Sequence, residues 1–155
     1  MTIKTIYIDV VDTTNLLELV SKFVEQNFNI LTSNATSKIL KRHKIPHSNV
    51  TKLTDWISIH HAIQHRLIDI VVVNIPDTMN IINKPKITIE DVYSKIDIPK
   101  LELLTTCSLY PNTIVLTHPN QYSSLDNITS TKSLQHVFAV LQQFNSLMSQ
   151  FLYLH

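Results

Sequence analysis

Three hydroxyl side chains lie where a predicted strand gives way to a predicted helix. Thr32, Ser33 and Thr36 fall between a β-branched run at residues 28–32 and a helical pattern at residues 33–42. Hydroxyl groups at the N-terminus of a helix can hold a phosphate or sulfate, because the first backbone N–H groups and the helix dipole attract anions. The pattern therefore predicts a weak anion site, which needs no catalytic group.

Asp12 and Thr14 form a second polar pair, at the start of a helix predicted over residues 14–26. Side chains at this position can hold a ligand, but they are also the residue types that cap a helix. Capping is the simpler interpretation, and ligand binding is the alternative.

Three histidines lie within the helix predicted over residues 56–66. His61 and His65 share one helix face at the i, i+4 spacing of some zinc sites, with His60 beside them. The pattern lacks the glutamate of a metalloprotease and offers no third ligand, so we expect a solvated helix face and no metal. Cys107, the one cysteine, lies on an apolar helical stretch and is expected in the core.

The composition limits the classes of function. The 155 residues are 44% hydrophobic and 16% charged, with a formal net charge of +1, which indicates one folded domain over residues 1–155. Scattered basic residues give no electrostatic case for nucleic acid, and no apolar run reaches the ~20 residues of a membrane span. There are no glycines, although average usage predicts about eleven. The chain thus lacks the residue that most often lets a backbone approach a phosphate closely. We expect a cytoplasmic protein without a cofactor.

The hydrophobic pattern alternates between short β-branched runs and longer helical stretches. The predicted strands are residues 3–11, 28–32, 49–53, 67–75 and 112–117. The predicted helices are residues 14–26, 33–42, 56–66, 88–95, 100–109 and 131–152. Residues 121–133 form a polar stretch, and no linker is evident.

This order predicts an α/β fold, in which a doubly wound parallel sheet lies between two layers of helices. Ligands of such sheets bind beyond the carboxyl ends of the strands. The segments of interest are therefore those that follow Val11, Thr32, Ile75 and Ile98.

Several segments also carry a resemblance to a known family. They are residues 9–19 (DVVDTTNLLEL), 28–40 (FNILTSNATSKIL), 44–53 (KIPHSNVTKL), 68–75 (IDIVVVNI), 84–98 (KPKITIEDVYSKIDI) and 113–122 (TIVLTHPNQY). In order and spacing they resemble the IMP cyclohydrolase domain of bifunctional AICAR transformylase/IMP cyclohydrolase, which has the methylglyoxal-synthase-like fold. The resemblance implies closure of the purine ring of formyl-AICAR to give IMP.

The site residues that the resemblance implies are only partly kept. Asp97 matches the catalytic aspartate of the family's Ile-Asp-Ile motif, and Asn74 matches an asparagine that follows the central strand. Asp12 and Thr14 match the first-strand loop, whereas Asp9 stands where the family has a serine.

Other positions depart from the family pattern. The phosphate turn reads Thr32-Ser33-Asn34-Ala35-Thr36, without the two glycines of the family. The glycines after the catalytic aspartate are replaced by Pro99 and Lys100. The Arg and Lys of the next helix are Thr105 and Leu109, and a long basic loop is missing after Trp56.

These losses predict a degenerate cyclohydrolase-like domain of purine biosynthesis, without catalysis, that keeps phosphate, nucleotide or protein binding, because catalytic groups act as a unit. Whether it is an enzyme stays open. An active, divergent cyclohydrolase would need replacement cations, and the candidates are Lys38, Lys52, Arg66, Lys84 and Lys100. Two further alternatives are an interaction module and a regulatory domain like that of carbamoyl phosphate synthetase.

The expected partners are a purine nucleotide or phosphate, and a protein surface on the last helix. Apolar residues recur there at three- and four-residue steps over residues 131–152, which is a wide stripe for one helix. A homodimer and a separate transformylase chain are the two protein partners that this stripe suggests.

Overall fold

The computed structural model describes residues 3–50 and 59–154. The strands are β1 (Thr5–Asp9), β2 (Asn29–Thr32), β3 (Ser48–Asn49), β4 (Ile70–Val73) and β5 (Ile114–Leu116). The helices are α1 (Leu16–Glu25), α2 (Asn34–Arg42), α3 (Ile59–Gln64), α4 (Thr78–Ile82), α5 (Ile89–Lys95), α6 (Ile98–Leu109) and α7 (Ser130–Leu154), and a 3₁₀ segment, η2, covers Pro119–Asn127.

The five strands form one parallel sheet in the order β3-β2-β1-β4-β5. All four residues of β4 are buried, which is the pattern of a strand covered on both faces. The chain runs outward from β1 to β3, then returns to place β4 on the other side of β1. The neighbouring strands β1 and β4 therefore form the topological switch point, where the carboxyl ends open a crevice.

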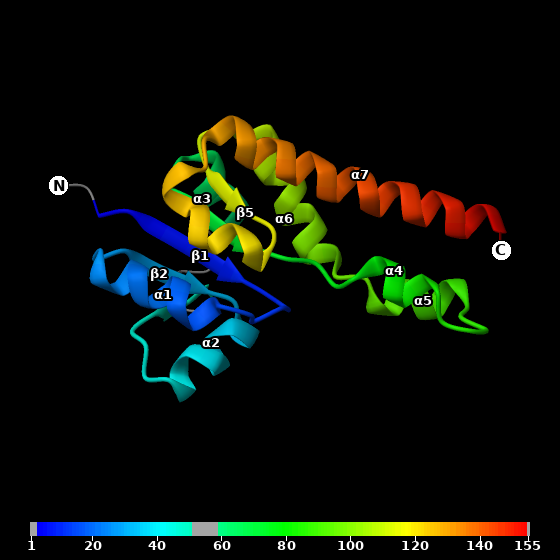
Figure 1. The fold of residues 1–155 in the computed structure, drawn as a ribbon, viewed down its shortest axis with the longest axis horizontal. Coiled ribbons are helices and arrows are strands. Elements are labelled where there is room, and N and C mark those ends of the chain that lie inside the picture. The colour runs from blue at the N-terminus through cyan, green and yellow to red at the C-terminus, as the bar shows by residue number, and fades with distance from the viewer. Residues whose placement is uncertain (1–2, 51–58, 155) are drawn as a thin grey trace.

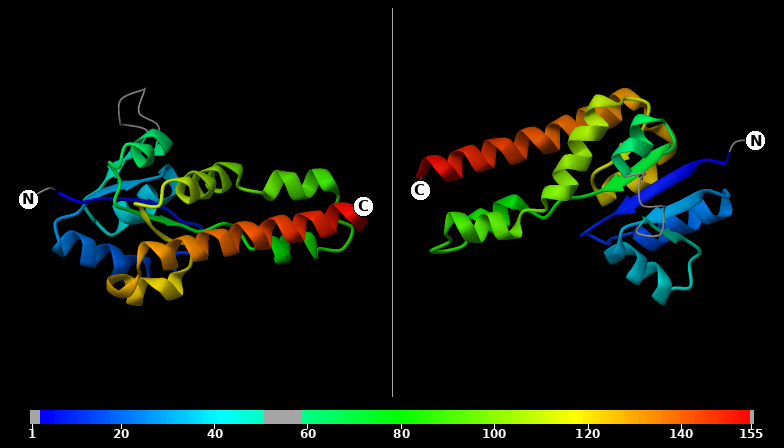
Figure 2. Two further views of the ribbon diagram at one scale, coloured as in Figure 1. Left: turned by 90° about the horizontal axis from the view of Figure 1, so that it is seen from above. Right: turned by 180° about the vertical axis from the view of Figure 1, so that it is seen from behind.

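Helices cover both faces of the sheet, which confirms the predicted α/β architecture (Figures 1 and 2). Alternate residues of β1 separate the two cores: Ile6 and Ile8 pack against α1 and α2, whereas Tyr7 packs against α3, α6 and α7. This alternation follows from the two-residue period of a strand.

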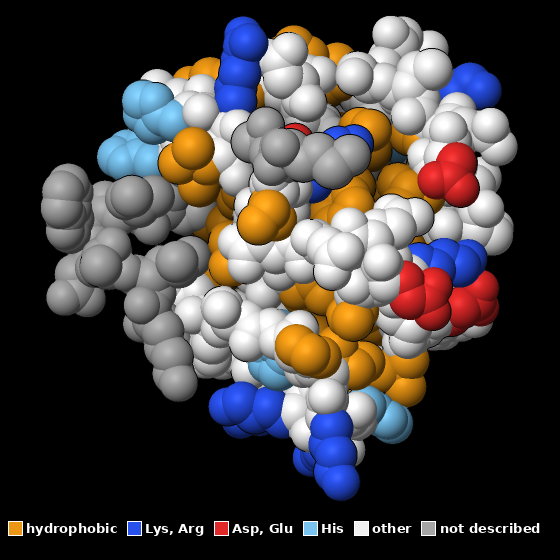
Figure 3. All heavy atoms as spheres, turned by 90° about the vertical axis from the view of Figure 1, so that its left-hand side faces the viewer, with side chains coloured by type: hydrophobic (Ala, Val, Ile, Leu, Met, Phe, Trp, Pro, Cys, Tyr) orange, Lys and Arg blue, Asp and Glu red, His pale blue; other side chains and the backbone are white. Residues whose placement is uncertain are grey.

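Helix α7 continues well past the sheet and covers a third, smaller core (Figure 1). Ile81 of α4 and Val92 of α5 pack there with Met148 and Phe151 of α7. The short helices α4 and α5 thus lie beyond the carboxyl edge of the sheet, under the second half of α7. No helix among the described residues has the length and apolar character of a membrane span. On the face at the amino ends of the strands, charged side chains are dispersed rather than gathered (Figure 3).

Two elements differ from the sequence predictions. The α4 turn was missed because its five residues are too short to show helical periodicity, although Asp77 caps it by accepting a hydrogen bond from the Asn80 amide. The segment 119–127 is a 3₁₀ helix that overlaps the polar stretch at residues 121–133. Residues 51–53 and 56–58 of the predicted third strand and third helix lie outside the described residues.

Among residues 3–50 and 59–154, left-handed backbone occurs without glycine at five positions. They are Asn15, Asn27, Lys44, Arg66 and Lys86, with φ between 56° and 58°. Asparagine tolerates this region, whereas lysine and arginine adopt it at a cost of about 1–2 kcal/mol. The glycine-free chain therefore keeps its tight turns and carries strain at three of them.

Candidate functional site

The loop after β1 is held by the side chain of Asn74, which follows β4. Asn74 Oδ1 accepts hydrogen bonds from the amides of Val11 (2.7 Å) and Asp12 (2.9 Å), and Nδ2 donates to the Asp12 carbonyl at 3.3 Å. Asn74 is buried. Two strand ends on either side of the switch point are thereby fixed to each other by one amide.

The loop after β5 has a similar clamp. Gln121 Oε1 accepts from the amides of Thr117 (2.7 Å) and His118 (3.0 Å), and from the Thr117 hydroxyl at 3.3 Å. His118 Nδ1 accepts from the Asn120 amide at 3.2 Å and so caps η2. Side-chain oxygens thus occupy the backbone donors that would otherwise point out of the strand ends.

A cavity of about 500 Å³ opens between these loops and the middle of α7. Its wall is formed by Val11 and Asp12, by residues 74–79, by residues 117–119, and by Val140, Gln143, Phe144 and Leu147. The cavity therefore lies beyond the carboxyl ends of β1, β4 and β5, where the fold class places its ligands.

The charged groups of this cavity are acidic. Its lining includes Asp12 and Asp77 together with His118, and no Lys or Arg side chain is among the lining residues. Asp12 is fully exposed, and hydrogen bonds from Thr14 hold the pKa of its carboxyl below its usual value. The Asp12 carboxylate is therefore ionised at neutral pH.

A second polar group lies on the α6 face of the sheet. The Lys100 ammonium is 2.6 Å from Asp97 Oδ2 and 3.1 Å from Asp9 Oδ1. All three side chains are largely covered, with 9%, 26% and 13% of the Lys100, Asp97 and Asp9 side chains exposed. None of the three lines the 500 Å³ cavity.

Asp97 also begins α6. Its Oδ1 accepts from the Lys100 amide at 3.2 Å, so the carboxylate caps the helix with one oxygen and pairs with the ammonium through the other. Burial alone would lower the pKa of Lys100, but the hydrogen bond to Asp97 and the charge of Asp9 outweigh it and raise that pKa. Burial, followed by the charges of Asp9 and Asp97, raises the pKa of Tyr7 nearby.

The three predicted anion-binding hydroxyls are engaged or covered. Thr32 and Thr36 are fully buried. Thr36 Oγ1 accepts from the Val10 amide and from the Ser33 hydroxyl, and Ser33 Oγ caps α2 by accepting from the Thr36 amide. Within the described part of the chain, the hydroxyls of Thr32 and Tyr122 are buried without a hydrogen-bond partner. An anion at the start of α2 would therefore meet the exposed residues Asn34 and Ala35 first.

The structure brings the predicted site residues together in three places. Asp12 and Asn74 border the cavity, with Thr14 bonded to Asp12. The hydroxyl cluster surrounds the start of α2, and Asp97 lies in the ion-paired group on the α6 face.

One predicted segment was wrong. Ile98 does not end a strand; it is the first residue of α6, because Asp97 caps that helix and Pro99 is compatible with its first turn. The loop that lines the cavity instead follows Leu116, the end of β5. His118 was therefore missed, although its position just after a predicted strand could have indicated it. Asp77 was also missed, although it lies in the selected segment that follows Ile75.

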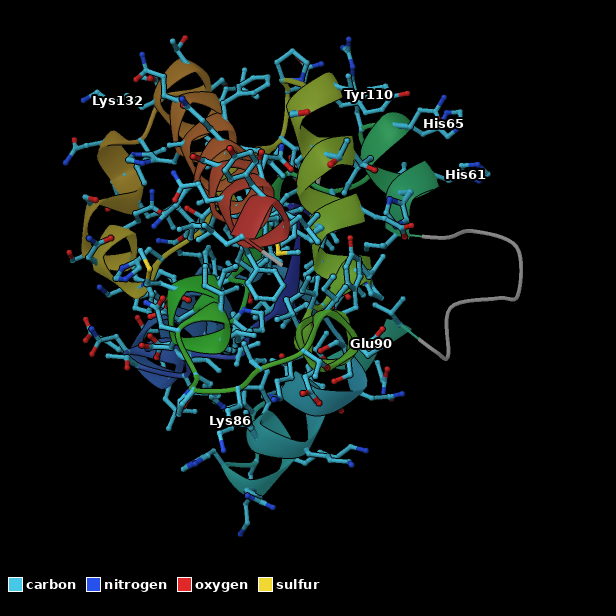
Figure 4. The ribbon with its side chains drawn as sticks, turned by 90° about the vertical axis from the view of Figure 1, so that its right-hand side faces the viewer. His61, His65, Lys86, Glu90, Tyr110 and Lys132 are labelled. Carbon is cyan, nitrogen blue, oxygen red and sulfur yellow. The ribbon has the colours of Figure 1, made fainter. Side chains whose placement is uncertain are left out.

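His61 of α3 and His65, the residue that follows this helix, point outward from the surface (Figure 4). His60 bonds to the Thr106 hydroxyl at 2.7 Å instead of joining them. Across residues 3–50 and 59–154, no group of three or more His, Cys, Asp or Glu side chains is arranged to hold a metal ion. Cys107 is buried, as predicted for a core residue, and burial raises the pKa of its thiol to about 12.

The doubly wound sheet with a crevice at its switch point defines the class of α/β domains that bind ligands at the carboxyl ends of parallel strands. Comparison with known proteins narrows this class. A family model described as "MGS-like domain" matches residues 15–101, more than half of the chain, so the chain belongs to the MGS-like domain family.

Two curated relatives are bifunctional purine biosynthesis proteins PurH. The protein from Buchnera aphidicola is 26% identical over 152 residues, and the match covers 81% of this chain. The protein from Synechocystis sp. is 27% identical over 150 residues, and the match covers 76% of this chain. In each case the match spans 29% of the relative's length. A crystal structure of ForH superposes on this chain with a TM-score of 0.74 at 12% sequence identity. The superposition covers 97% of this chain and 100% of the ForH chain, which supports the fold.

Proposed function

We propose that this MGS-like domain is a cyclohydrolase-like domain of purine biosynthesis that has lost catalysis and acts by binding. The observation that carries the proposal is the position of the Lys100 ammonium between Asp9 and Asp97. Asp97 is the residue for which the resemblance implies a catalytic role, and both of its oxygens are engaged by Lys100.

The charges of the cavity also support the proposal that catalysis is lost. Ring closure in the related enzymes requires donors and cations that stabilise developing charge and hold a 5′-phosphate, as the resemblance implies. The cavity wall offers two carboxylates and no Lys or Arg. Asp97 does not line this cavity. It borders a second, smaller cavity, and Ile75, Pro76 and Thr78 line both cavities. The segment 75–78 therefore lies between Asp97 and the 500 Å³ cavity.

The test is ring closure of formyl-AICAR by the purified protein, followed by ultraviolet absorbance. A no-protein sample is the blank, and the PurH protein of Buchnera aphidicola is the candidate positive control. We expect no rate above the blank. A rate that scales with the concentration of this protein would overturn the proposal.

An active, divergent cyclohydrolase is the second candidate, and one observation favours it. Of the five basic residues that could replace the lost cations, Lys100 is the one that the structure places beside Asp97, whereas Lys38, Arg66 and Lys84 are exposed. Lys52 lies outside the described residues. If ring closure is observed, Lys100→Met is expected to abolish it while Lys84→Met leaves it unchanged. Equal activity of the two variants would exclude Lys100 as the replacement cation.

A protein-binding role is the third candidate, and α7 favours it. Residues 133–154 contain no Asp, Glu, Lys or Arg, yet Phe138 is 56% exposed and Leu152 is 42% exposed. An open groove between α6 and α7 is lined by uncharged side chains, among them Leu101, Phe138 and Leu141. Interface cores are depleted of charged residues in the same way.

We propose a second copy of this chain as the partner of α7, because its own α7 face is uncharged and a twofold contact would pair like with like. Light scattering is expected to give twice the monomer mass, and Phe138→Asp is expected to return the monomer. Gln135→Asp, on an exposed position of the same helix, is the matched control. A monomeric wild-type protein would count against self-association and leave a different protein, such as a separate transformylase chain, as the partner to test.

Phosphate or nucleotide binding at Thr32, Ser33 and Thr36 stays a prediction. The start of α2 supports it, because the first N–H groups of a helix lack partners within the helix and attract anions. Titration of inorganic phosphate against the amide resonances of Asn34 and Ala35 tests it, and unchanged resonances at millimolar phosphate would refute it.

A further inference from the structure

We infer that the 500 Å³ cavity at the carboxyl ends of β1, β4 and β5 binds a small organic cation with an apolar ring, and discriminates against phosphorylated and other anionic compounds. The inference rests on one part of the proposed function, namely that the domain acts by binding. It concerns a different place from the hydroxyl cluster, because Thr32, Ser33 and Thr36 do not line the cavity.

The walls of the cavity are suited to an apolar body. Val140, Phe144 and Leu147 contribute one side from α7, and Ile75, Pro76 and Met79 contribute from the segment after β4. A volume of about 500 Å³ lies within the usual range for small-molecule sites. A ring compound of one or two fused rings can therefore be largely removed from water against these side chains.

The backbone donors that the loops after β1 and β5 present at the cavity rim are already used. In many α/β proteins, free N–H groups at the carboxyl ends of the strands hold an anionic ligand. Here the amides of Val11 and Asp12 donate to Asn74, and those of Thr117 and His118 donate to Gln121. An anion would have to displace these bonds before it could be held by the backbone.

The charges at the cavity rim favour a cationic ligand over an anionic one. Asp12 and Asp77 carry the formal charges among the lining residues, and both are exposed at the opening. His118 Nδ1 accepts the Asn120 N–H, which leaves Nε2 as the ring nitrogen that can donate to a ligand. With no Lys or Arg in the lining, an ammonium group is attracted and a phosphate is repelled.

The two acids can be neutralised without loss of their structural roles. Asp77 caps α4 and Asp12 accepts the Thr14 amide in the loop after β1. Asparagine performs both tasks, since it is a good N-cap and forms the same local turn. The variant Asp12→Asn/Asp77→Asn therefore changes the charge of the cavity and preserves its shape.

The experiment compares tryptamine with indole-3-acetate, which share one ring system and differ in the sign of their charge. Calorimetric titration of the full chain at low salt is expected to give about tenfold tighter binding of tryptamine. In Asp12→Asn/Asp77→Asn the ratio is expected to fall to about one, and Glu25→Gln, an exposed acid far from the lining residues, is expected to keep it. Gln143→Trp fills the cavity from an exposed position of α7 and is expected to remove binding of both compounds.

Three results would overturn the inference. They are binding of indole-3-acetate at least as tight as that of tryptamine, binding that survives Gln143→Trp, and absence of binding by either compound at millimolar concentration. Failure here is distinguishable from failure of the proposed function, because the absence of formyl-AICAR ring closure is measured separately and does not depend on which compound the cavity takes.

Discussion

Replacing Lys100 by methionine is expected to destabilise the fold far more than replacing a lysine in a surface ion pair. The substitution keeps most of the apolar volume but leaves Asp9 and Asp97, both largely covered, without their shared cation. Removal of one partner of a buried ion pair typically costs about 3–5 kcal/mol. Because the carboxylates retain 13% and 26% exposure and can be partly hydrated, we expect about 2–3 kcal/mol.

The matched control is Lys22→Met, which removes an exposed pair. Lys22 lies 3.0 Å from Glu18 at i, i+4 spacing, with half or more of both side chains exposed, so its loss is expected to cost less than about 0.5 kcal/mol. Urea unfolding followed by circular dichroism at pH 7 gives both free energies. Equal effects of Lys100→Met and Lys22→Met would refute the buried-pair reasoning.

The dependence on pH is a second readout. A raised pKa in the folded state means that Lys100 stabilises the fold fully below its unfolded pKa of about 10.5, and that this contribution is lost as the pH rises through the higher folded value. The difference in stability between wild type and Lys100→Met is therefore expected to stay constant from pH 7 to about 9.5 and to shrink above about 10.5. A difference that already shrinks between pH 7 and 9 would show that the folded pKa is not raised.

Three other substitutions follow from the described structure. Lys86→Gly should stabilise the fold by up to about 1 kcal/mol, because Lys86 adopts φ 58° in the turn between α4 and α5 (Figure 4). The control is Lys84→Gly, which changes a nearby residue without left-handed backbone and should not stabilise the fold. Equal shifts of the two variants in thermal unfolding would show that Lys86 carries no strain. Thr32→Val removes a buried hydroxyl that lacks a partner and is expected to raise stability or leave it unchanged, so a loss above about 1 kcal/mol in urea unfolding would contradict that assignment. Ser133→Ala removes the hydroxyl that bonds both the amide and the carbonyl of Val115 in β5. Hydrogen exchange at the Val115 amide should become faster, and the free energy of unfolding should fall by about 1–3 kcal/mol. Unchanged exchange at this amide would count against the bond.

The sheet could be predicted from sequence because its signals are local. The run Ile70–Val73 is apolar throughout, and the stretches for α1 and α2 show the period of a helix, so the order of strands and helices fixes a doubly wound sheet. The start of the helix predicted over residues 88–95 was equally readable: Thr88 is the N-cap of α5 and exchanges hydrogen bonds with Asp91.

The candidate site could be predicted only in part, because its contacts join distant residues. Asn74 was expected from the resemblance, but its bonds to the loop after β1 cross more than 60 positions of sequence. The pairing of Lys100 with Asp9 is also long-range, and the two residues are separate departures from the family pattern when read along the chain. The role of Gln121 depends on a 3₁₀ segment whose sequence has no clear periodicity.

The ion pair between Asp9 and Lys100 also has a consequence for how this chain can change over generations. The resemblance puts a serine at position 9 and a glycine at position 100, so both charges differ from the family pattern together. Reversion of Asp9 alone would leave Lys100 with one counter-charge, and reversion of Lys100 alone would leave two covered carboxylates without a cation. Either single change is expected to lower the stability of the fold, because it leaves a covered charge with fewer partners. Asp9 and Lys100 are therefore expected to tolerate joint replacement better than the replacement of either one alone.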